Sequence, residues 1–580
     1  MMKVVVGMAR WGLVLMVALA ACAPSSARNA TAAPGEPAAT PGKRACGMVA
    51  SSSALASHAG YEILRQGGNA VDAAVAIAFA EAVTYPTAGN LGGGGFMLIR
   101  MADGRAAAID YREMAPAKAS RDMYLDERGQ VIPEASTVGY LAAAVPGTVA
   151  GLAMAHQQFG VLSWDAVIEP ARKLAADGFI FHAALSDSLK HNRRLLGRFP
   201  ESNRIFLNDG RLHQVGKIFR QPELGDTLAR IQREGWREFY EGRTAQLIAE
   251  DMERHGGLIT LDDLRNYRAK PREMLRGSYR GYELLTMPPP SSGGIVLIAM
   301  LNMLETYDLG SLGPRSPETY HRLVEVMKRA FADRATFFGD PDFVDVPAKG
   351  LTDKRYAREL AKTIDLQRAT PSEQVRPGDP LPYESTETTH FSVVDAAGNG
   401  VSNTYTLNTG YGSGVTVRGA GFLLNNEMDD FTSKVGSPNV FDLIQGEANA
   451  IEPGKRPLSS MTPTMLLKDG KLVLVLGSPG GPTIINSVLQ VLVNVIDHRL
   501  PLDKAVAAPR LHHQWLPDKI RYEPEGLADD TKKAMEAMGH RFVSVPRRIG
   551  DVQAIAVDPT SGVRHGVSDP RARDGKAVGD

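Results

Sequence analysis

The stretch E-T-T-H-F-S-V-V-D-A-A-G-N-G-V-S-N-T-Y-T-L-N, residues 387–408, predicts a β-hairpin. Phe391, Val393 and Val394 form a short β-prone run, and residues 401–407 form a second run that is rich in Thr, Tyr and Val. The A-G-N-G sequence between the two runs is typical of a turn. This pattern alone does not distinguish Thr388 from any other β-forming residue at the start of a strand.

The segment before the hairpin is expected to be exposed and extended. Residues 371–386 are rich in Pro, Ser, Glu and Thr, and they show no hydrophobic periodicity. Exposed backbone of this kind is where cleavage of a chain is best tolerated. The segment leads directly into Thr388.

Alternating helices and strands are predicted further upstream. Residues 57–66 predict a helix that ends at two glycines, and Asn69 is a typical N-cap for a second helix at 70–83. The second helix is apolar on nearly every face, which predicts that it is buried. The glycine run that follows lacks a phosphate-loop pattern, so we interpret it as close packing before a strand at 96–99. Two more helices are predicted, at 166–177 and 295–304.

A second hairpin is predicted at 464–467 and 471–476, and an apolar helix is predicted at 483–497. Between them lies G-S-P-G-G, residues 477–481. A strand, then glycines, then a helix start can point free backbone N–H groups at one spot, as an oxyanion hole requires. A simple tight turn is the alternative that the residues themselves leave open.

Charged and amide side chains gather at two other places. Arg112 follows a predicted strand at 106–110, where it can pair with a bound carboxylate or form a surface ion pair with Asp110 or Glu113. Residues 425–430 bring two amides and three acids together. Such a cluster suits an ammonium group or a Ca²⁺ ion, although the pattern of a calcium loop is absent. The Gly- and Asn-rich segment 435–453 lacks apolar periodicity and is a candidate mobile lid.

The composition is that of an ordinary globular protein. The chain has 580 residues, of which 43% are hydrophobic and 22% charged, and its 65 Lys and Arg balance its 65 Asp and Glu. No basic excess favours binding to nucleic acid. The two cysteines, Cys22 and Cys46, do not form a C-x-x-C pair, which argues against a zinc ribbon or a redox pair.

The first 45 residues predict export. Residues 1–21 have the basic start and short apolar core of a signal peptide, and the core is too short to span a membrane comfortably. L-A-A-C at 19–22 resembles a bacterial lipobox, in which Cys22 would be lipidated after cleavage; ordinary signal cleavage near Ala20 is the alternative. Residues 22–45 predict a flexible linker. A disulfide between Cys22 and Cys46 requires that Cys22 is not acylated.

Several motifs carry a resemblance to a known family. In chain order they are D-Y-R-E-M-A-P at 110–116, T-T-H-F-S-V-V-D at 388–395, Y-T-L-N at 405–408, L-L-N-N-E-M-D-D-F at 423–431, P-L-S-S-M at 457–461 and G-S-P-G-G at 477–481. Together they resemble the γ-glutamyltransferase family, also called γ-glutamyltranspeptidases or glutathione hydrolases. These enzymes belong to the N-terminal nucleophile hydrolases. The resemblance extends over about residues 46–572, and the ordered set is far more specific than any single motif.

The resemblance implies a role for each matching residue. The chain would cut itself between Glu387 and Thr388, and Thr388 would become an N-terminal nucleophile whose own α-amino group acts as base. Thr406 would orient this nucleophile. Gly480 and Gly481 would form the oxyanion hole. The substrate's α-carboxylate would be held by Arg112, Ser459 and Ser460, and its α-ammonium group by Asn408, Glu427 and Asp430.

The resemblance also implies a fold and an activity. The fold would be an α/β four-layer αββα sandwich of the N-terminal nucleophile hydrolase type, formed jointly by a large subunit (46–387) and a small catalytic subunit (388–580) that stay together as a heterodimer. The expected activity is cleavage of the γ-glutamyl bond of glutathione and related compounds, with transfer of the acyl group to water, an amino acid or a dipeptide. No metal or cofactor is implied. The expected location is the periplasm, with membrane attachment only through a lipid anchor.

Three other functions remain open. A β-lactam side-chain acylase or a poly-γ-glutamate depolymerase would use the same scaffold. The presence of Arg112 together with Asn408 and Asp430 favours a small γ-glutamyl amino acid over a bare dicarboxyl side chain. An inactive lipoprotein that binds glutamyl peptides is the third possibility, and no motif in the chain is visibly damaged.

Overall fold

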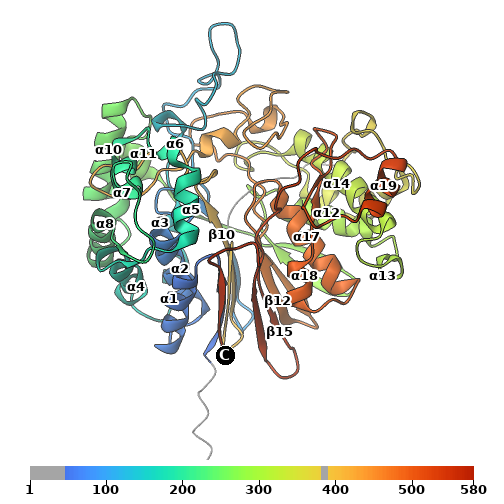
Figure 1. Cartoon of the computed structure of the whole chain (residues 1–580), viewed down its shortest axis with the longest axis horizontal. Helices are drawn as coiled ribbons and strands as arrows, with labels where there is room; N and C mark the ends of the chain where they lie inside the picture. Colours follow the sequence, from blue (N-terminus) through green and yellow to red (C-terminus); the bar gives the residue numbers. More distant parts are fainter. Residues whose placement is uncertain (1–45, 381–389) are drawn as a thin grey trace, which may run out of the picture. The chain divides into compact units, whose positions relative to one another are not determined.

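The computed structural model of the chain describes residues 46–380 and 390–580. The predicted signal peptide, Cys22, the linker, and the pair Glu387 and Thr388 lie outside the described residues. The described part contains two large sheets that lie face to face, with helices on both outer sides (Figure 1). The prediction of an α/β fold is confirmed.

All strand pairs in the two large sheets are antiparallel. The first sheet has seven strands in the order β17 (Lys576–Gly579), β1 (Gly47–Ser51), β9 (Phe391–Asp395), β10 (Gly400–Thr406), β2 (Gly94–Arg100), β3 (Ala106–Tyr111) and β6 (Lys270–Arg272). The second has six strands in the order β16 (Arg564–Ser568), β15 (Gln553–Val557), β12 (Lys471–Gly477), β11 (Thr464–Lys468), β8 (Tyr282–Thr286) and β7 (Leu275–Tyr279). Both predicted hairpins, β9–β10 and β11–β12, are therefore present.

Side chains on alternate sides of each strand contact two different layers of the fold. On β2, Met97 and Ile99 pack with the helices of the first layer, whereas Phe96 and Leu98 join the apolar cluster between the sheets. Successive side chains of a strand point to opposite faces, so a strand covered on both faces must be apolar throughout. This requirement explains why β2 reads as a continuous hydrophobic run.

Helices from the first half of the chain cover the seven-stranded sheet. They are α1 (Ala54–Arg65), α2 (Ala70–Thr84), α3 (Thr148–Phe159), α4 (Trp164–Ala176), α5 (Ala183–His191), α6 (Arg193–Leu196), α7 (Pro200–Leu207), α8 (Pro222–Glu234), α9 (Glu238–Glu241), α10 (Arg243–His255) and α11 (Leu261–Asn266). As predicted, α2 is buried along its whole length and Asn69 caps it, accepting hydrogen bonds from the backbone N–H groups of Val71 and Asp72. Helix α1 begins three residues earlier than predicted, because Ser53 caps it.

Helices from later in the chain cover the six-stranded sheet. They are α12 (Gly293–Leu304), α13 (Leu309–Leu312), α14 (Pro317–Phe337), α15 (Ala348–Leu351), α16 (Lys354–Lys362), α17 (Thr483–Ile496), α18 (Leu502–Ala507) and α19 (Asp529–Ala537). Two short two-stranded sheets complete the fold, β4 (Phe179–Ile180) with β5 (Ile218–Phe219) and β13 (Leu511–His512) with β14 (Arg521–Tyr522). The helices predicted at 295–304 and 483–497 correspond to α12 and α17.

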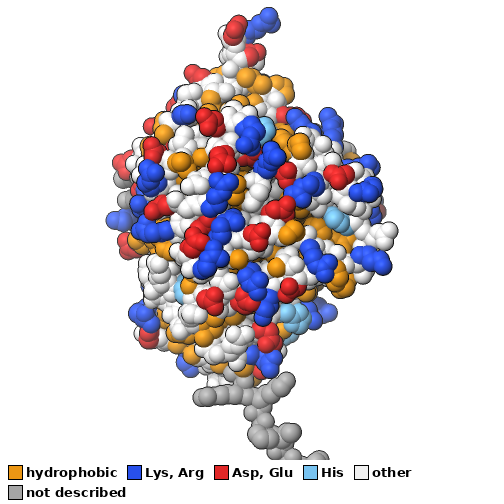
Figure 2. Space-filling model, turned by 90° about the vertical axis from the view of Figure 1, so that its left-hand side faces the viewer, with side chains coloured by type: hydrophobic (Ala, Val, Ile, Leu, Met, Phe, Trp, Pro, Cys, Tyr) orange, Lys and Arg blue, Asp and Glu red, His pale blue; other side chains and the backbone are white. Residues whose placement is uncertain are grey.

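The outer face of the first helical layer mixes charges of both signs, with apolar side chains scattered among them (Figure 2). Ion pairs such as Arg204 with Glu223 and Arg243 with Glu250 lie on these helices. Within the described ranges, no helix is both long and apolar enough to cross a membrane.

Gly477, the last residue of β12, allows the two sheets to approach each other beside the start of β9. A Cβ atom at this position would lie 2.4 Å from Nδ1 of His390. The ring of His390 is fixed by hydrogen bonds to the hydroxyl groups of Thr404 and Ser392, at 3.0 and 2.8 Å. The ring therefore has little freedom to move away.

We expect Gly477→Ala to lower the free energy of unfolding by about 1–3 kcal/mol, because the added methyl group overpacks a buried site. Gly410→Ala is the matched control, since the nearest atom to its Cβ would be at 3.5 Å. Urea unfolding of both variants gives the comparison. Equal stability of the two variants would contradict the predicted clash.

Candidate functional site

The predicted site residues that the structure describes meet at one end of the two sheets. Because all pairs are antiparallel, the start of β9 lies beside the end of β10, and the end of β10 lies beside the start of β2 (Thr406 opposite Gly94) and near the end of β3. In the second sheet, the end of β12 lies beside the starts of β11 and β15. Ser402 joins the two sheets near this end, through hydrogen bonds with the backbone of Thr464.

Arg112 is the centre of a buried ionic network. It follows β3, its side chain is fully buried, and it pairs with Glu427 Oε2 at 2.8 Å and Asp430 Oδ2 at 2.6 Å. Glu113 Oε2 lies 3.5 Å from the same guanidinium group. The simple alternative of a surface ion pair with Asp110 or Glu113 is wrong, because the side chain is inaccessible and its closest acids come from the 427–430 turn.

The network contains more acids than bases. One guanidinium group, Arg112, faces three carboxylates, and Arg334 adds a second positive charge near Asp430. Burial alone would lower the pKa of Arg112, but the charges of Glu427, Glu113 and Asp430 raise it above its ordinary value. Burial raises the pKa of Glu113 to about 7, against the opposing charge of Arg112. Burial likewise raises the pKa of Asp430.

Ser459 and Ser460 adjoin this network. The carbonyl oxygens of the two preceding residues, Pro457 and Leu458, accept hydrogen bonds from Arg112 at 3.3 and 3.5 Å. Both serine side chains are fully buried, and neither hydroxyl group has a hydrogen-bond partner among the described residues. A buried polar group without a partner is rare and costly, which indicates a position meant for a ligand.

Thr406 and Asn408 form a second part of the site. The hydroxyl oxygen of Thr406 accepts a hydrogen bond from the backbone N–H of Asn408 at 2.9 Å. The Asn408 side chain donates to the carbonyl oxygen of Asn426 at 3.0 Å, which places it beside the residue that precedes Glu427. The φ angle of Asn408 is +77°, a conformation that asparagine adopts more readily than most residues.

Gly480 and Gly481 lie between β12 and α17, as predicted. Both have positive φ angles, +130° and +55°, and no described residue accepts a hydrogen bond from either N–H group. A Cβ atom on Gly481 would lie 2.9 Å from the ring of Phe441. The neighbouring Asn439 and Val440 contact Asp430 and Asp429, at 3.4 and 3.1 Å, so segment 439–441 connects the glycines with the acids. Movement of 435–453 as a lid stays a prediction.

Two residues near the site were not singled out from the sequence. The sequence predicts Glu113 only as a surface partner of Arg112, although its place in the D-Y-R-E motif is a usable signal. His390 directly follows the T-T pair, and burial lowers its pKa to about 3, so its imidazole is neutral near pH 7. Its two hydrogen bonds hold the start of β9 in place. No sequence pattern distinguishes a histidine with this structural role from an ordinary core histidine.

One group in the described part has the composition of a metal site, namely His321, Glu325 and His540. The two imidazoles share a hydrogen bond of 2.8 Å, and Glu325 already pairs with Lys328 and Arg329 at 3.1 and 2.8 Å. Two adjacent cations make the group unfavourable for a metal ion. We interpret it as a structural ionic cluster.

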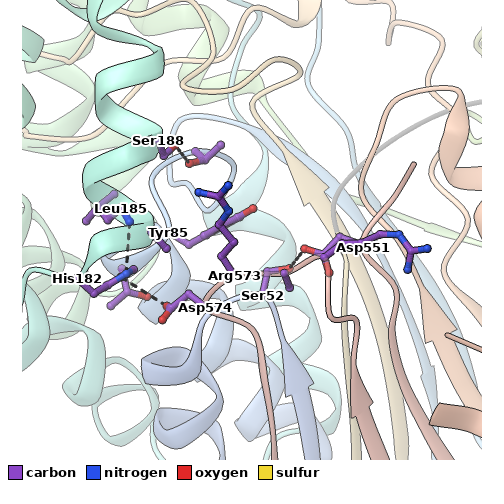
Figure 3. A pocket seen from close by; sticks show the side chains of 13 residues that line it. Ser52, Tyr85, His182, Leu185, Ser188, Asp551, Arg573 and Asp574 are labelled. Carbon is purple, nitrogen blue, oxygen red and sulfur yellow. Dashed lines mark hydrogen bonds and ion pairs between the residues drawn. The ribbon is translucent and has the colours of Figure 1, made fainter. Parts of the chain in front are cut away.

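A cavity of about 210 Å³ lies near the C-terminal segment (Figure 3). Its polar side chains largely pair with one another: His182 Nε2 lies 3.5 Å from Asp574 Oδ2, and the hydroxyl group of Ser52 donates to Asp551 at 3.4 Å. Burial, together with the charge of Asp569, raises the pKa of Asp551 to about 7. The backbone N–H of Asp551 donates to Ser478 Oγ at 2.9 Å. Asp551 therefore connects this cavity with the glycine loop at 477–481.

The fold and site can be compared with those of known proteins. A crystal structure of cephalosporin acylase from Bacillus halodurans shares the fold, with a TM-score of 0.82 and 28% identity over 94% of this chain and 99% of that one. The γ-glutamyltranspeptidase of Helicobacter pylori matches 56% of this chain and 94% of its own, with 45% identity and a TM-score of 0.56. The architecture is therefore that of a class that includes acylases and transpeptidases.

The sequence comparisons are more specific. Residues 56–579 match the family model of gamma-glutamyltranspeptidase. A glutathione hydrolase proenzyme of Escherichia coli is 48% identical over 97% of this chain and 98% of its own. An acylase proenzyme of a Pseudomonas species is 41% identical over 88% of this chain and 90% of its own. The chain belongs to the gamma-glutamyltranspeptidase family and is an enzyme, so the predicted resemblance is confirmed.

We expect Arg112→Gln to destabilise the protein by about 3–5 kcal/mol near neutral pH, because it leaves buried carboxylates without their cation. The deficit should grow between pH 5 and pH 8. An acid whose folded pKa lies above its unfolded value loses stability as the pH rises from the unfolded value to the folded one, and loss of Arg112 raises the folded pKa of Glu113 further.

Urea unfolding at pH 5 and pH 8 measures this effect. Arg265→Gln is the control, because Arg265 and its partner Asp262 are both exposed. The control should change stability by less than about 1 kcal/mol at either pH. A deficit of Arg112→Gln that is equal at both pH values would show that the ionic network does not set it.

Proposed function

We propose that the protein is a self-processing γ-glutamyl hydrolase and transpeptidase that cleaves the γ-glutamyl bond of glutathione and related compounds. Family membership and the kinship with glutathione hydrolase proenzymes support this function. The observation that carries the proposed binding mode is the buried network of Arg112, Glu427 and Asp430 beside the unpartnered hydroxyl groups of Ser459 and Ser460.

The network suits the α-carbon end of a γ-glutamyl group, which carries one ammonium and one carboxylate. The carboxylate would bind Arg112, Ser459 and Ser460, and the ammonium would bind Glu427 and Asp430 with Asn408. A zwitterion adds no net charge to the buried network, so no uncompensated charge is left away from water. A carboxylate that arrives without an ammonium group would add negative charge where acids already outnumber bases.

The proposed nucleophile is the hydroxyl group of Thr388. Its proton would pass to the α-amino group of the same residue, whose ordinary pKa of about 7.7–8.0 suits a base near neutral pH. The Thr388 oxygen would then bond to the γ-carbonyl carbon, and the N–H groups of Gly480 and Gly481 would hold the resulting oxyanion. The C–N bond breaks, and the leaving amine takes the proton. Water or an acceptor amine then cleaves the γ-glutamyl ester and restores Thr388.

An α-amino group on Thr388 requires prior cleavage after Glu387. The hydroxyl group of Thr388 would attack the Glu387 carbonyl, the acyl group would shift from nitrogen to oxygen, and water would hydrolyse the ester. The products would be a large subunit, 46–387, and a small subunit, 388–580. Interleaved strands support their staying together, because β9 from the small subunit pairs with β1 from the large one.

Export is part of the proposal. The residues 1–21 would act as a signal peptide and direct the protein to the periplasm, and residues 22–45 would form a flexible linker. A lipid on Cys22 would provide membrane attachment. The basis for the anchor is the L-A-A-C sequence alone.

We expect purified wild-type protein to consist of two chains, with the smaller one beginning at Thr388, and Thr388→Ala to remain a single chain. A denaturing gel and intact mass measure this directly. Thr386→Ala, two residues away in the same segment, should still be cleaved. A folded wild-type protein that stays in one chain would exclude the N-terminal base and favour an inactive binding protein.

We also expect γ-glutamyl 4-nitroanilide to be hydrolysed at least about 100-fold more efficiently than glutaryl 4-nitroanilide, which lacks the α-ammonium group. When that group is absent, the buried side chains that would bind it are left without a hydrogen-bond partner. Asp430→Ala, which removes both acceptor oxygens, should reduce this ratio, whereas Glu427→Gln, which keeps an acceptor oxygen, should preserve most of it. Release of 4-nitroaniline gives kcat/KM for each enzyme variant with each of the two substrates. A wild-type preference for the glutaryl substrate would instead support a β-lactam side-chain acylase.

A further inference from the structure

Segment 432–447 forms a surface loop whose two ends lie together. The backbone N–H of Thr432 donates to the carbonyl oxygen of Asn449 at 2.9 Å, and the Thr432 hydroxyl group donates to the carbonyl oxygen of Gly446 at 2.8 Å. A compact loop of about 6–16 residues with neighbouring ends is an Ω-loop, a type of segment that is frequently functional. What holds the ends of this loop is therefore of interest.

The middle of the loop contacts both parts of the proposed site. Residues 439–441 contact Asp430, Asp429 and Gly481, as described above. Gln445 also donates from its side chain to the backbone carbonyl oxygen of Asp430 at 3.0 Å. A displacement of the loop would therefore disturb the surroundings of the proposed ammonium ligand.

Close packing does not fix the loop on the side that faces segment 131–137. A cavity of about 280 Å³ lies between the two, and its lining includes Val131, Pro438, Val440 and Asp429. Side chains that border a cavity lack the contacts that fix residues in a densely packed interior. On this side, the position of the loop therefore depends on polar contacts at its ends.

Arg121 joins the two ends of the loop. Its guanidinium group donates to both carboxylate oxygens of Glu447, each at 3.0 Å, and to the backbone carbonyl oxygens of Thr432 and Ser433 at 3.2 and 3.0 Å. The planar guanidinium group has five N–H donors in a fixed arrangement, so one side chain can make all four bonds. The hydrogen bond from Arg121 lowers the pKa of the Glu447 carboxyl group, which keeps the pair charged near neutral pH.

We propose that Arg121 is a positioning residue for γ-glutamyl binding, because it holds the ends of loop 432–447 together and so keeps the surroundings of Asp430 in place. The proposal rests on the γ-glutamyl function above and adds a residue that acts through the loop. After the proposed cleavage, Arg121 would belong to the large subunit and the loop to the small one. The same side chain would then connect the two chains beside the site.

Kinetics of γ-glutamyl 4-nitroanilide hydrolysis test the role of Arg121 in binding. Arg112 still pairs with Asp430 in Arg121→Gln, so we expect KM to rise by only about three- to tenfold and kcat to stay within about twofold of wild type. The double variant Arg121→Gln/Glu447→Gln should raise KM no further than Arg121→Gln does, because both changes affect one contact. Arg265→Gln, whose partner Asp262 is also exposed, is the control and should match wild type in both constants.

Tryptic cleavage after Lys434 measures the loop directly, because Lys434 lies within it and the cleavage rate does not depend on activity. We expect this cleavage to be at least about threefold faster in Arg121→Gln than in wild type or in Arg265→Gln, since a loosened loop opens more often. The masses of the fragments identify the cleaved bond.

An unchanged KM in Arg121→Gln, an unchanged rate of tryptic cleavage, or a further rise of KM in the double variant would overturn the proposal. Failure of wild type to release 4-nitroaniline at all would instead contradict the γ-glutamyl function. The tryptic rates would still show whether Arg121 holds the loop, so the two failures are distinguishable.

Discussion

The pairing of β9 with β1 on one side and β10 on the other is the constraint on which the rest of the site depends. It places a strand from late in the chain at the centre of a sheet whose other members come from both ends of the chain. Because the pairs are antiparallel, the start of β9 is brought to the edge where β3, β10 and β12 end. His390, which directly precedes β9, thus lies beside Gly477 at the end of β12.

The ionic network around Arg112 adds a second constraint, one of charge. A buried cation with several buried acids is tolerated only when each charge has a partner, and here two of the three acids, Glu427 and Asp430, come from a turn more than 300 residues away in sequence. The network therefore ties the 427–430 turn to the end of β3 before any ligand binds. Its excess of carboxylates, with the pKa of Glu113 raised to about 7, leaves room for one more cationic group.

The sequence predicted the local elements well, because their signals are local. The turn at 397–400, the cap at Asn69 and the apolar face of α17 each specify an element from a few neighbouring residues. It could not predict the layer order of the sheets or the burial of Arg112, because both follow from contacts between distant segments. The resemblance to a family predicts which residues belong to the site, but the burial of Glu113 beside Arg112 and the hydrogen bonds of His390 are visible only in the structure.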